Sequence, residues 1–549
     1  MAESEQGGGS RIVPPASTDA VIVGGGHNGL VAAAYLARFG MQVTLLERLD
    51  RTGGAAVSEQ PFPGVDVRLS RYSYLVSLLP YAIVRDLELD VELRSRPVSS
   101  FTPVARNGRH DALLVERRPG PHTRDSFHRV TGSEQDWNAW REFYGRIERA
   151  ARALAPTLLE PLVGKGVAMK AVREACGAKF WDDFMERPLG EVVERTFGND
   201  HVRGVVLTDA LIGTQSHAHD PSLRQNRCFL YHVIGSGTGE WRVPIGGMGA
   251  VTDSLSRAAE KAGAVLVTGA TVQRIESDGR RASVVYRTGD GERRIDAKFV
   301  LANTAPTVLD ALLGRAPRPK PEGNQLKVNM VLARLPRLRS GAPPETAFAG
   351  TFHIDEAYST LSAAYEASEA GRLPDPLPTE VYCHTLTDRS ILGRDALSRG
   401  LHTLTLFGLH TPARLYGAHD LTEEAVRDVA VQRALEGLNR YLAEPIEDCL
   451  ARDAHGDPCI EARTPLDIER ELAMPGGHIF HGDLDWPWAA DSDEAGRWGV
   501  ETDLPNVLIC GSGARRGGAV SGIPGRAAAF ALLLRRRRRR VAGALESGG

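Results

Sequence analysis

The chain has little cysteine, with six residues in 549 and no two of them spaced as a CxxC or CxxxxC pair. So few and scattered thiols exclude a disulfide-stapled secreted scaffold, a zinc ribbon and a redox-active disulfide. A chain of this length can bury a sizeable core without such staples. We therefore expect a protein of the reducing cytoplasm, built from two or three domains.

An excess of charge of one sign is also lacking. The formal net charge is -3, which argues against a dedicated nucleic-acid-binding protein. The longest apolar runs, such as residues 527–534, fall far short of the roughly 20 residues that span a bilayer. Residues 1–10 lack the charged-then-apolar order of a signal peptide. We expect a cytoplasmic protein, at most peripheral to a membrane, with a flexible lead over residues 1–17.

Glycine is plentiful, and its first cluster follows a strand-like run at residues 19–23. The order that follows is glycine turn, helix closed by Gly40, strand at residues 42–46, and acid, as in a dinucleotide-binding βαβ unit. In this unit the glycines permit a tight turn and close approach to a pyrophosphate, the helix N-terminus faces the negative charge, and the acid accepts ribose hydroxyls. The glycines are Gly24, Gly26 and Gly29, and the acid is Glu47.

Two further glycine-rich segments indicate flavin rather than nicotinamide. Residues 51–54 place Gly53 and Gly54 directly after the second strand, where FAD enzymes bring a second turn against the cofactor phosphates. Near the other end, a strand-like run at 506–510 leads into a glycine-rich segment and a helix from about residue 526. That segment offers backbone donors to a phosphate or to the flavin pyrimidine edge.

These segments resemble the phytoene desaturase-related FAD-dependent oxidoreductases, most closely the pyridine nucleotide-disulphide oxidoreductase domain-containing protein 2 subfamily. The resemblance spans roughly residues 19–534 and includes supporting segments at 70–75, 244–249, 326–330 and 475–482. It implies an α/β fold: a discontinuous Rossmann-type FAD-binding domain with an inserted mixed-sheet and helical substrate domain. The implied cofactor-binding residues are Gly24, Gly26, Asn28, Gly29, Glu47, Arg48, Gly53, Gly54, Ala55, Val272, Gly511, Gly513, Ser521, Gly522 and Ile523.

The expected domain boundaries follow from the same resemblance. The FAD-binding domain comprises residues 18–80, 225–315 and 485–534, and the substrate domain comprises 81–224 and 316–484. In the substrate domain, aromatic and apolar residues from Trp137 to Leu154 are spaced as an amphipathic helix. Residues 326–335 read as a strand, 339–378 as a long connection with short helices, and 421–443 as a helix capped by Thr422.

Candidate catalytic residues lie in two places. His478 and His481 sit on a glycine-flanked loop just before the cofactor-binding end segment, where they would lie near the isoalloxazine as proton carriers or pocket residues. No third ligand is spaced to make a zinc site with them, and we expect no metal. Lys327 is conspicuous because lysine is scarce in this chain, and flavin amine oxidases hold a water at flavin N5 with a lysine on such a strand. Arg71, Tyr72 and Tyr74 are expected to line the substrate pocket.

Six consecutive arginines, from Arg535 to Arg540, follow the last helix. We expect residues 535–549 to form a basic C-terminal tail, solvated or in weak contact with an anionic membrane surface.

The sequence thus predicts an FAD-dependent oxidoreductase, a dehydrogenase or desaturase. It would remove hydride from a C–C or C–N bond of a mostly apolar, lipophilic small molecule and pass the electrons to oxygen, a quinone or another acceptor. Two alternatives remain open: a flavin amine oxidase using Lys327, and a low-turnover interaction protein with a flavoprotein fold.

Overall fold

The first of two large sheets contains the expected dinucleotide-binding unit. The computed structural model of the protein describes residues 15–417 and 421–546. The parallel strands β12, β1, β2 and β9 lie in this order, with β18 parallel to β12 and the antiparallel strands β11 and β10 beyond it. Their bounds are Ser17–Val23 (β1), Val43–Leu46 (β2), Val265–Val267 (β9), Thr271–Ser277 (β10), Ala282–Thr288 (β11), Gly291–Ala302 (β12) and Val507–Ile509 (β18).

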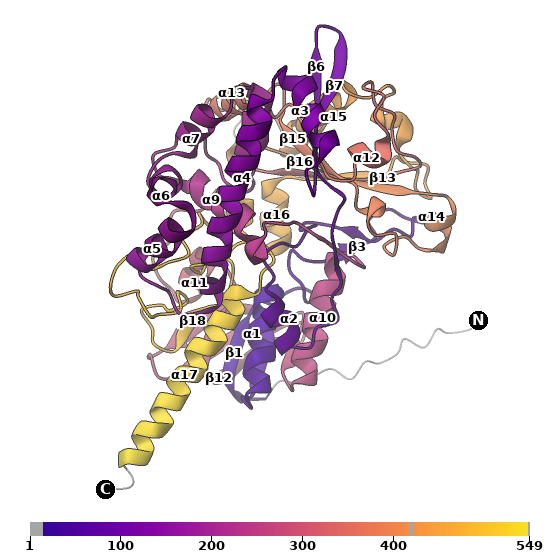
Figure 1. The fold of residues 1–549 in the computed structure, drawn as a ribbon. Coiled ribbons are helices and arrows are strands. Elements are labelled where there is room, and N and C mark those ends of the chain that lie inside the picture. The colour runs from indigo at the N-terminus through magenta and orange to yellow at the C-terminus, as the bar shows by residue number, and fades with distance from the viewer. Residues whose placement is uncertain (1–14, 418–420, 547–549) are drawn as a thin grey trace, which may run out of the picture.

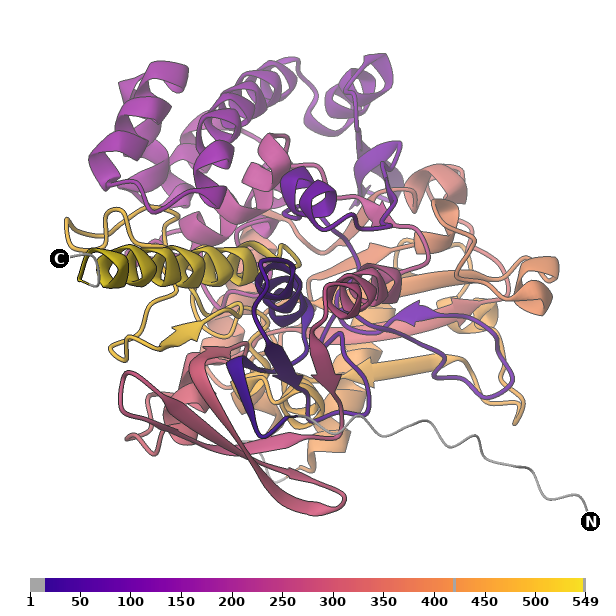
Figure 2. The ribbon, with the colours of Figure 1, turned by 90° about the horizontal axis from the view of Figure 1, so that it is seen from below.

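Three helices lie side by side on one face of this sheet (Figure 2). The central one, α1 (His27–Arg38), is buried along almost its whole length, between α10 (Met248–Lys261) and α17 (Ile523–Glu546). Alanine and glycine allow this close packing, since a Cβ at Gly525 would lie 2.0 Å from the Asn28 carbonyl oxygen. The first and last segments of the described chain therefore meet at the glycine turn that opens α1.

The second sheet is mixed and curves above the first (Figure 1). Its order is β17-β13-β16-β15-β14-β6-β7, antiparallel except where β14 meets β6. Its bounds are Val98–Arg106 (β6), Arg109–Glu116 (β7), Leu326–Leu332 (β13), Thr351–Ile354 (β14), Thr379–Tyr382 (β15), His402–Gly408 (β16) and Ile460–Arg463 (β17).

A layer of helices packs beside the second sheet (Figure 1). Its centre is α4 (Gln135–Leu154), an amphipathic helix as predicted. Trp137, Trp140 and Ile147 of the predicted face are buried, whereas Tyr144 is only partly buried and the neighbouring Phe143 is buried as well. The other helices of this layer are α5 (Lys165–Cys176), α6 (Ala178–Met185), α7 (Leu189–Thr196), α8 (Asp200–Thr208) and α9 (Arg224–Ile234).

The structure differs from the sequence-based expectation in two internal stretches. Residues 339–378 are not mainly a connection, because they contain β14 and α13 (Tyr358–Glu369). α9 packs into the helical layer rather than with the first sheet, although residue 225 was expected to open a cofactor-domain segment. The predicted domain boundaries otherwise stay a prediction. By contrast, α15 (Glu423–Asn439) begins as predicted, with Thr422 accepting a hydrogen bond from the Ala425 N–H group at 3.2 Å.

The C-terminal helix is longer than the sequence suggests. α17 continues through the arginine run to Glu546, so residues 535–546 are helical in backbone and not an irregular tail. The remaining tail residues, 547–549, and residues 1–14 of the predicted lead lie outside the described residues. A weak membrane contact of this run stays a prediction. Within residues 15–417 and 421–546, no helix combines the length and the apolar character needed to cross a membrane.

Candidate active site

The first glycine turn closes tightly between β1 and α1. Gly24 has a φ of +99°, which glycine adopts without strain. A Cβ at Gly29 would lie 2.3 Å from the Gly24 carbonyl oxygen, so only glycine allows the helix to start here. The unpaired N–H groups at the start of α1 therefore lie at the turn, where they favour an anionic group.

The carboxylate of Glu47 lies directly against this turn. Its Oε2 accepts a hydrogen bond from the Gly25 N–H group at 2.7 Å, and its Oε1 accepts one from the Leu49 N–H group at 2.8 Å. The side chain follows β2 and is buried. The predicted contact of Glu47 with ribose hydroxyls stays a prediction, and its placement is compatible with it.

The second glycine turn contacts the first. The Gly53 N–H group donates to the Gly25 carbonyl oxygen at 2.8 Å. Gly54 has a φ of +58°, and a Cβ there would lie 3.2 Å from the Gly26 Cα. The glycines of the two turns thus lie against each other and form one continuous cradle. Because no side chain projects from these glycines, the cradle is of the kind that admits a pyrophosphate.

The C-terminal glycine segment completes the cradle through Asn303. The Asn303 amide donates to the carbonyl oxygens of Gly24 at 3.1 Å and Gly26 at 3.3 Å. A Cβ at Gly511 would lie 3.1 Å from the same asparagine. Asn303, which directly follows β12, was not among the predicted site residues.

The other C-terminal candidates lie where this segment turns into α17. A Cβ at Gly513 would lie 2.4 Å from Pro306, and Gly522 has a φ of +71°. The Ser521 hydroxyl accepts a hydrogen bond from the Ile523 N–H group at 3.2 Å, at the first residue of α17.

Two buried polar atoms lie at the start of α1 without a hydrogen-bond partner among the described residues: Nε2 of His27 and Oδ1 of Asn28. Burial lowers the pKa of His27 to about 4, so the ring is neutral at pH 7. Unpaired buried polar atoms are costly unless a ligand completes them. Together with the cradle, they fit a polar cofactor at this place. His27 was not among the predicted residues, although it lies within the glycine motif.

Three other predicted cofactor residues have diverse surroundings. Ala55 lines the cavity described below. Val272 lies half-buried on β10, at a bulge in its pairing with β11, and keeps its predicted role as a prediction. Arg48 differs from the expectation, because its guanidinium donates to the carbonyl oxygens of Arg470, at 3.4 Å, and Glu471 in α16 (Pro465–Leu472).

A cavity of about 780 Å³ extends from the glycine segments into the space between the second sheet and the helical layer. This volume suits a small organic molecule. One end is formed by Ala55 and residues 518–520, and the walls carry many aromatic and aliphatic side chains. The aromatic lining residues include Tyr72, Tyr74, Trp137, Trp140, Tyr144, Tyr231, Trp241, Tyr382, Phe407 and Phe480.

The predicted pocket residues divide into two groups. Tyr72 and Tyr74 line the cavity, and so does Lys327, which was predicted as a catalytic residue. Arg71 does not appear in the described lining, because its guanidinium is held by carboxylates: it pairs with Glu59, and with Glu461 at 3.7 Å.

Lys327 lies on β13 with its ammonium group almost fully buried. Its Nζ donates to the carbonyl oxygens of Ser70, at 3.0 Å, and Tyr72, at 2.5 Å. It also lies 5.4 Å from the ring centre of Tyr74 and 5.0 Å from that of Phe407. Burial holds the pKa of Lys327 well below its usual value, because desolvation disfavours the charged amine.

The two histidines of the glycine-flanked loop lie beside the cavity, not on it. His478 and His481 are absent from its described lining, whereas Ile479 and Phe480 between them are part of it. The His478 Nδ1 accepts hydrogen bonds from the N–H groups of Phe480, at 3.2 Å, and Gly482, at 3.3 Å. This atom therefore shapes the loop, and its pKa is lowered to about 4 by burial.

His481 belongs to the cofactor side of the loop. A Cβ at Gly513 would lie 3.5 Å from the Cβ of His481. Burial, with the neighbouring rings of His478 and His27, lowers the pKa of His481 to about 4. Its Nδ1 is buried without a partner among the described residues. The predicted proton-carrier role of both histidines stays a prediction.

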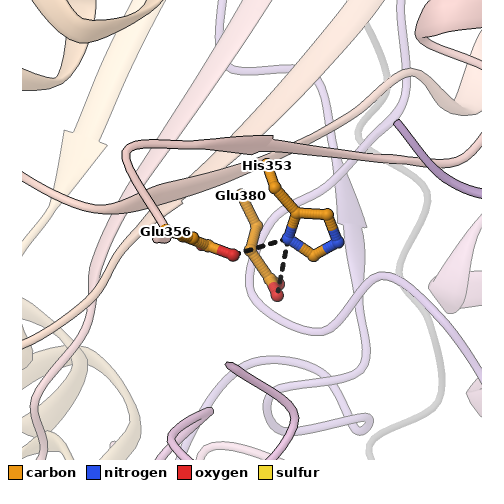
Figure 3. A group of neighbouring side chains, drawn as sticks. All are labelled: His353, Glu356 and Glu380. Atoms are coloured by element: carbon orange, nitrogen blue, oxygen red, sulfur yellow. Dashed lines mark hydrogen bonds and ion pairs between the residues drawn. The ribbon is translucent and has the colours of Figure 1, made fainter. Parts of the chain in front are cut away.

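A second polar group on the cavity was missed entirely. His353, Glu356 and Glu380 each offer an atom within 4.8 Å of the others, and their side chains point toward one another (Figure 3). His353, Glu380 and Asp209 line the cavity. The available signal was a charged residue inside each of two apolar, strand-like runs, at residues 351–354 and 379–382.

Comparisons with known proteins agree with this geometry. A family model described as an NAD(P)-binding Rossmann-like domain matches residues 22–79. An uncharacterised protein of Mycobacterium tuberculosis is 50% identical over 94% of this chain and 97% of its own length. The mouse pyridine nucleotide-disulfide oxidoreductase domain-containing protein 2 is 29% identical over 96% of this chain and 95% of its own length.

Solved structures share the fold at low sequence identity. A putrescine oxidase variant matches with a TM-score of 0.56 and 17% identity, over 95% of this chain and all of that one. The cyclohexylamine oxidase of Brevibacterium oxydans matches with a TM-score of 0.51 and 15% identity, over 94% of this chain and all of that one. These likenesses concern the fold alone. They confirm the predicted α/β class with a Rossmann-type cofactor domain and an inserted mixed-sheet and helical unit.

Proposed function

We propose that this protein is an FAD-dependent oxidoreductase. The chain belongs to the same family as the mycobacterial protein and pyridine nucleotide-disulfide oxidoreductase domain-containing protein 2. The substrate would be a mostly apolar small molecule that loses hydride from a C–C or C–N bond. Oxygen, a quinone or another acceptor would take the electrons.

One observation carries the proposal: the glycine segments that form the cofactor cradle also form one end of the cavity. Ala55 follows the second glycine turn, and residues 518–520 belong to the C-terminal segment. A group held by these backbones is therefore presented directly to whatever fills the cavity. A flavin bound there would accept a hydride from a neighbouring carbon.

The residues of this chain supply binding and exclusion of water. The turns at Gly26 and Gly54 admit phosphates, and Glu47 is placed for the ribose. The aromatic walls bury an apolar substrate and keep water from the reacting bond. Such walls favour a lipophilic molecule over a sugar or a nucleotide as the substrate.

A flavin amine oxidase is the second candidate, because Lys327 lines the same cavity with a lowered pKa. Its amine would hold or move a proton at Nζ while the substrate is oxidised. Lys327→Met leaves the cradle intact, so substrate-dependent flavin reduction that persists in this variant would remove lysine from the mechanism.

The first test is the absorption spectrum of the purified protein, recorded anaerobically before and after NADPH is added. We expect the two visible bands of an oxidised flavin in the native protein and their loss in Gly26→Val. Gly26 has a φ of -68°, so valine meets no left-handed strain but occupies the space beside Asn303. Gly166→Ala is the matched control, because a Cβ there meets nothing within 4 Å.

The outcomes separate the hypotheses. Full flavin content in Gly26→Val contradicts the proposed cradle, and a native protein that binds no FAD favours an interaction protein. Bleaching by NADPH identifies a nicotinamide as the electron source and turns the assignment toward a reductase. A flavin that stays oxidised directs the search toward apolar substrates and amines, tested as reductants.

A further inference from the structure

Two neighbouring strands of the second sheet bring histidine and glutamate side chains together beneath the cavity. His353 on β14 and Glu380 on β15 are direct partners in the antiparallel register, so both side chains lie on the same face. Glu356 follows two residues after β14 and turns back toward them (Figure 3). One ligand-type atom from each residue lies within 4.8 Å of the others.

All three side chains are almost fully buried. The His353 Nδ1 lies 2.5 Å from the Glu356 Oε2 and 3.8 Å from the Glu380 Oε1. Glu380 accepts further hydrogen bonds from the hydroxyls of Tyr382, at 2.5 Å, and Thr208, at 3.3 Å. Glu356 is only 1% exposed, and its other oxygen, Oε1, is buried with no hydrogen-bond partner among the described residues.

One protein cation interacts with this cluster: the buried guanidinium of Arg96 acts electrostatically on Glu380 and His353. In the described part of the chain, the only close ion pairs of Glu356 and Glu380 are those with His353. Asp209, after α8, adds a third carboxylate, which interacts electrostatically with Glu380 and His353. Burial raises the pKa of Asp209 and that of Glu380 to about 7, and that of Glu356 well above its ordinary value. Buried carboxylates of this kind either hold protons or bind a cation.

We propose that His353, Glu356 and Glu380 bind a divalent metal ion whose open coordination positions face the cavity. Zinc and related ions bind nitrogen and carboxylate oxygen at about 2.0–2.2 Å, so two ligands of a tetrahedral ion lie about 3.4 Å apart. To reach that geometry, the His353 Nδ1 must move away from Glu356 and slightly toward Glu380. The ion replaces the proton shared between His353 and Glu356, and it supplies a partner for the unpaired Glu356 oxygen.

The ligand set indicates which ions fit. One imidazole nitrogen with two or three carboxylates favours Zn²⁺, Mn²⁺ or Fe²⁺ over Mg²⁺ and Ca²⁺, which prefer oxygen ligands alone. His353, Glu380 and Asp209 line the cavity, so a bound ion meets the substrate there. It would coordinate an oxygen or nitrogen atom of that molecule. This site is separate from the glycine cradle, and the proposal does not depend on the flavin.

The test uses the full-length protein with its cofactor as purified, treated with a chelator and dialysed. Titration calorimetry with ZnCl₂, and electron paramagnetic resonance with MnCl₂, measure the ions bound per chain. Glu380→Gln and Glu356→Gln each remove a charged ligand at nearly constant volume. Glu194→Gln is the matched control, because Glu194 contacts His219 at 2.9 Å on the surface, outside this cluster.

We expect one tight ion per chain in the native protein and in Glu194→Gln, and a loss of affinity of at least 100-fold in both cluster variants. X-ray absorption at the zinc edge of the unsubstituted, zinc-loaded protein must also show an imidazole nitrogen beside oxygen ligands and no sulfur ligand. This second measurement decides the matter if a cluster variant fails to fold. An absent ion, binding that the cluster variants leave unchanged, or an ion without a nitrogen ligand would overturn the proposal and leave a proton-sharing cluster.

Discussion

Arg516 is a single side chain whose removal should loosen the C-terminal glycine segment. Arg516 is only 1% exposed. Its guanidinium donates hydrogen bonds to the carbonyl oxygens of Thr157 at 2.7 Å, Glu160 at 2.6 Å and Trp498 at 3.3 Å. It thus ties the segment at residues 511–522 to the end of the helical layer. Burial lowers the pKa of Arg516 to about 10, so it remains charged at pH 7. Arg516→Met keeps the aliphatic stem and deletes the donors.

The magnitude follows from the two short bonds. A hydrogen bond from a charged donor contributes about 1.5–3 kcal/mol, so two of them amount to about 3–6 kcal/mol. The variant also regains part of the cost of burying a cation. The local opening free energy should therefore fall by about 2–4 kcal/mol. This corresponds to a roughly 30- to 700-fold increase in amide exchange rate for the affected peptides.

Hydrogen–deuterium exchange with mass spectrometry measures this directly at residues 155–160 and 511–522. Arg515→Met is the control, since the Arg515 guanidinium pairs with Glu494 at 2.9 Å nearer the surface. Loss of such a pair costs about 0–1 kcal/mol and changes exchange by no more than about fivefold. Equal exchange in the two variants would show that the Arg516 hydrogen bonds do not stabilise residues 511–522. It would also refute the idea that the helical layer stabilises this cofactor segment.

Three further predictions rest on separate contacts. Lys327→Met removes the donor to the Ser70 and Tyr72 carbonyl oxygens and should lower the free energy of unfolding by about 1–3 kcal/mol. An unchanged melting temperature would show that these hydrogen bonds do not stabilise the fold. Burial raises the pKa of Glu380 to about 7, so the native protein loses stability as the pH rises through that value and the buried carboxyl gives up its proton. Glutamine carries no such proton. With chelator present, Glu380→Gln should therefore raise the melting temperature above that of the native protein more at pH 8 than at pH 5. Thr464→Ala breaks the capping box of α16 and should cost about 0.5–2 kcal/mol, seen as faster exchange at the start of that helix and nowhere else.

The cofactor half of the site could be predicted from the sequence because its signals are local. Gly24, Gly26, Gly29 and Glu47 lie within one βαβ unit. The positive φ of Gly24 and the close approach at Gly29 require glycine, and such geometry is determined by a short segment. The C-terminal segment was predicted from the same turn chemistry. Arg48 was the exception, because its partners in α16 lie more than four hundred residues further along the chain.

The substrate half could not be predicted in the same way. His353 and Glu380 become neighbours only when β14 and β15 pair, and residues 339–378 carry too many breakers to reveal β14. His478 and His481 were named for their position near the cofactor segment, and their role as proton carriers stays a prediction. The structure adds that the His478 Nδ1 holds the loop, which a sequence pattern does not reveal.

The arrangement of the cavity also constrains how a substrate lies in it. Residues next to the glycine turns line it, His353 and Glu380 come from the second sheet, Asp209 follows α8, and the walls carry aromatic rings. Two groups that line the cavity, the Tyr231 hydroxyl and the Gln325 amide, have buried polar atoms with no hydrogen-bond partner among the described residues. A purely apolar molecule would leave them unpaired, and buried polar groups left unpaired cost free energy. A substrate with one polar nitrogen or oxygen atom and an apolar body satisfies the cavity better than a pure hydrocarbon. Of the two bond types in the proposed reaction, the cavity therefore favours oxidation in a molecule that carries such an atom.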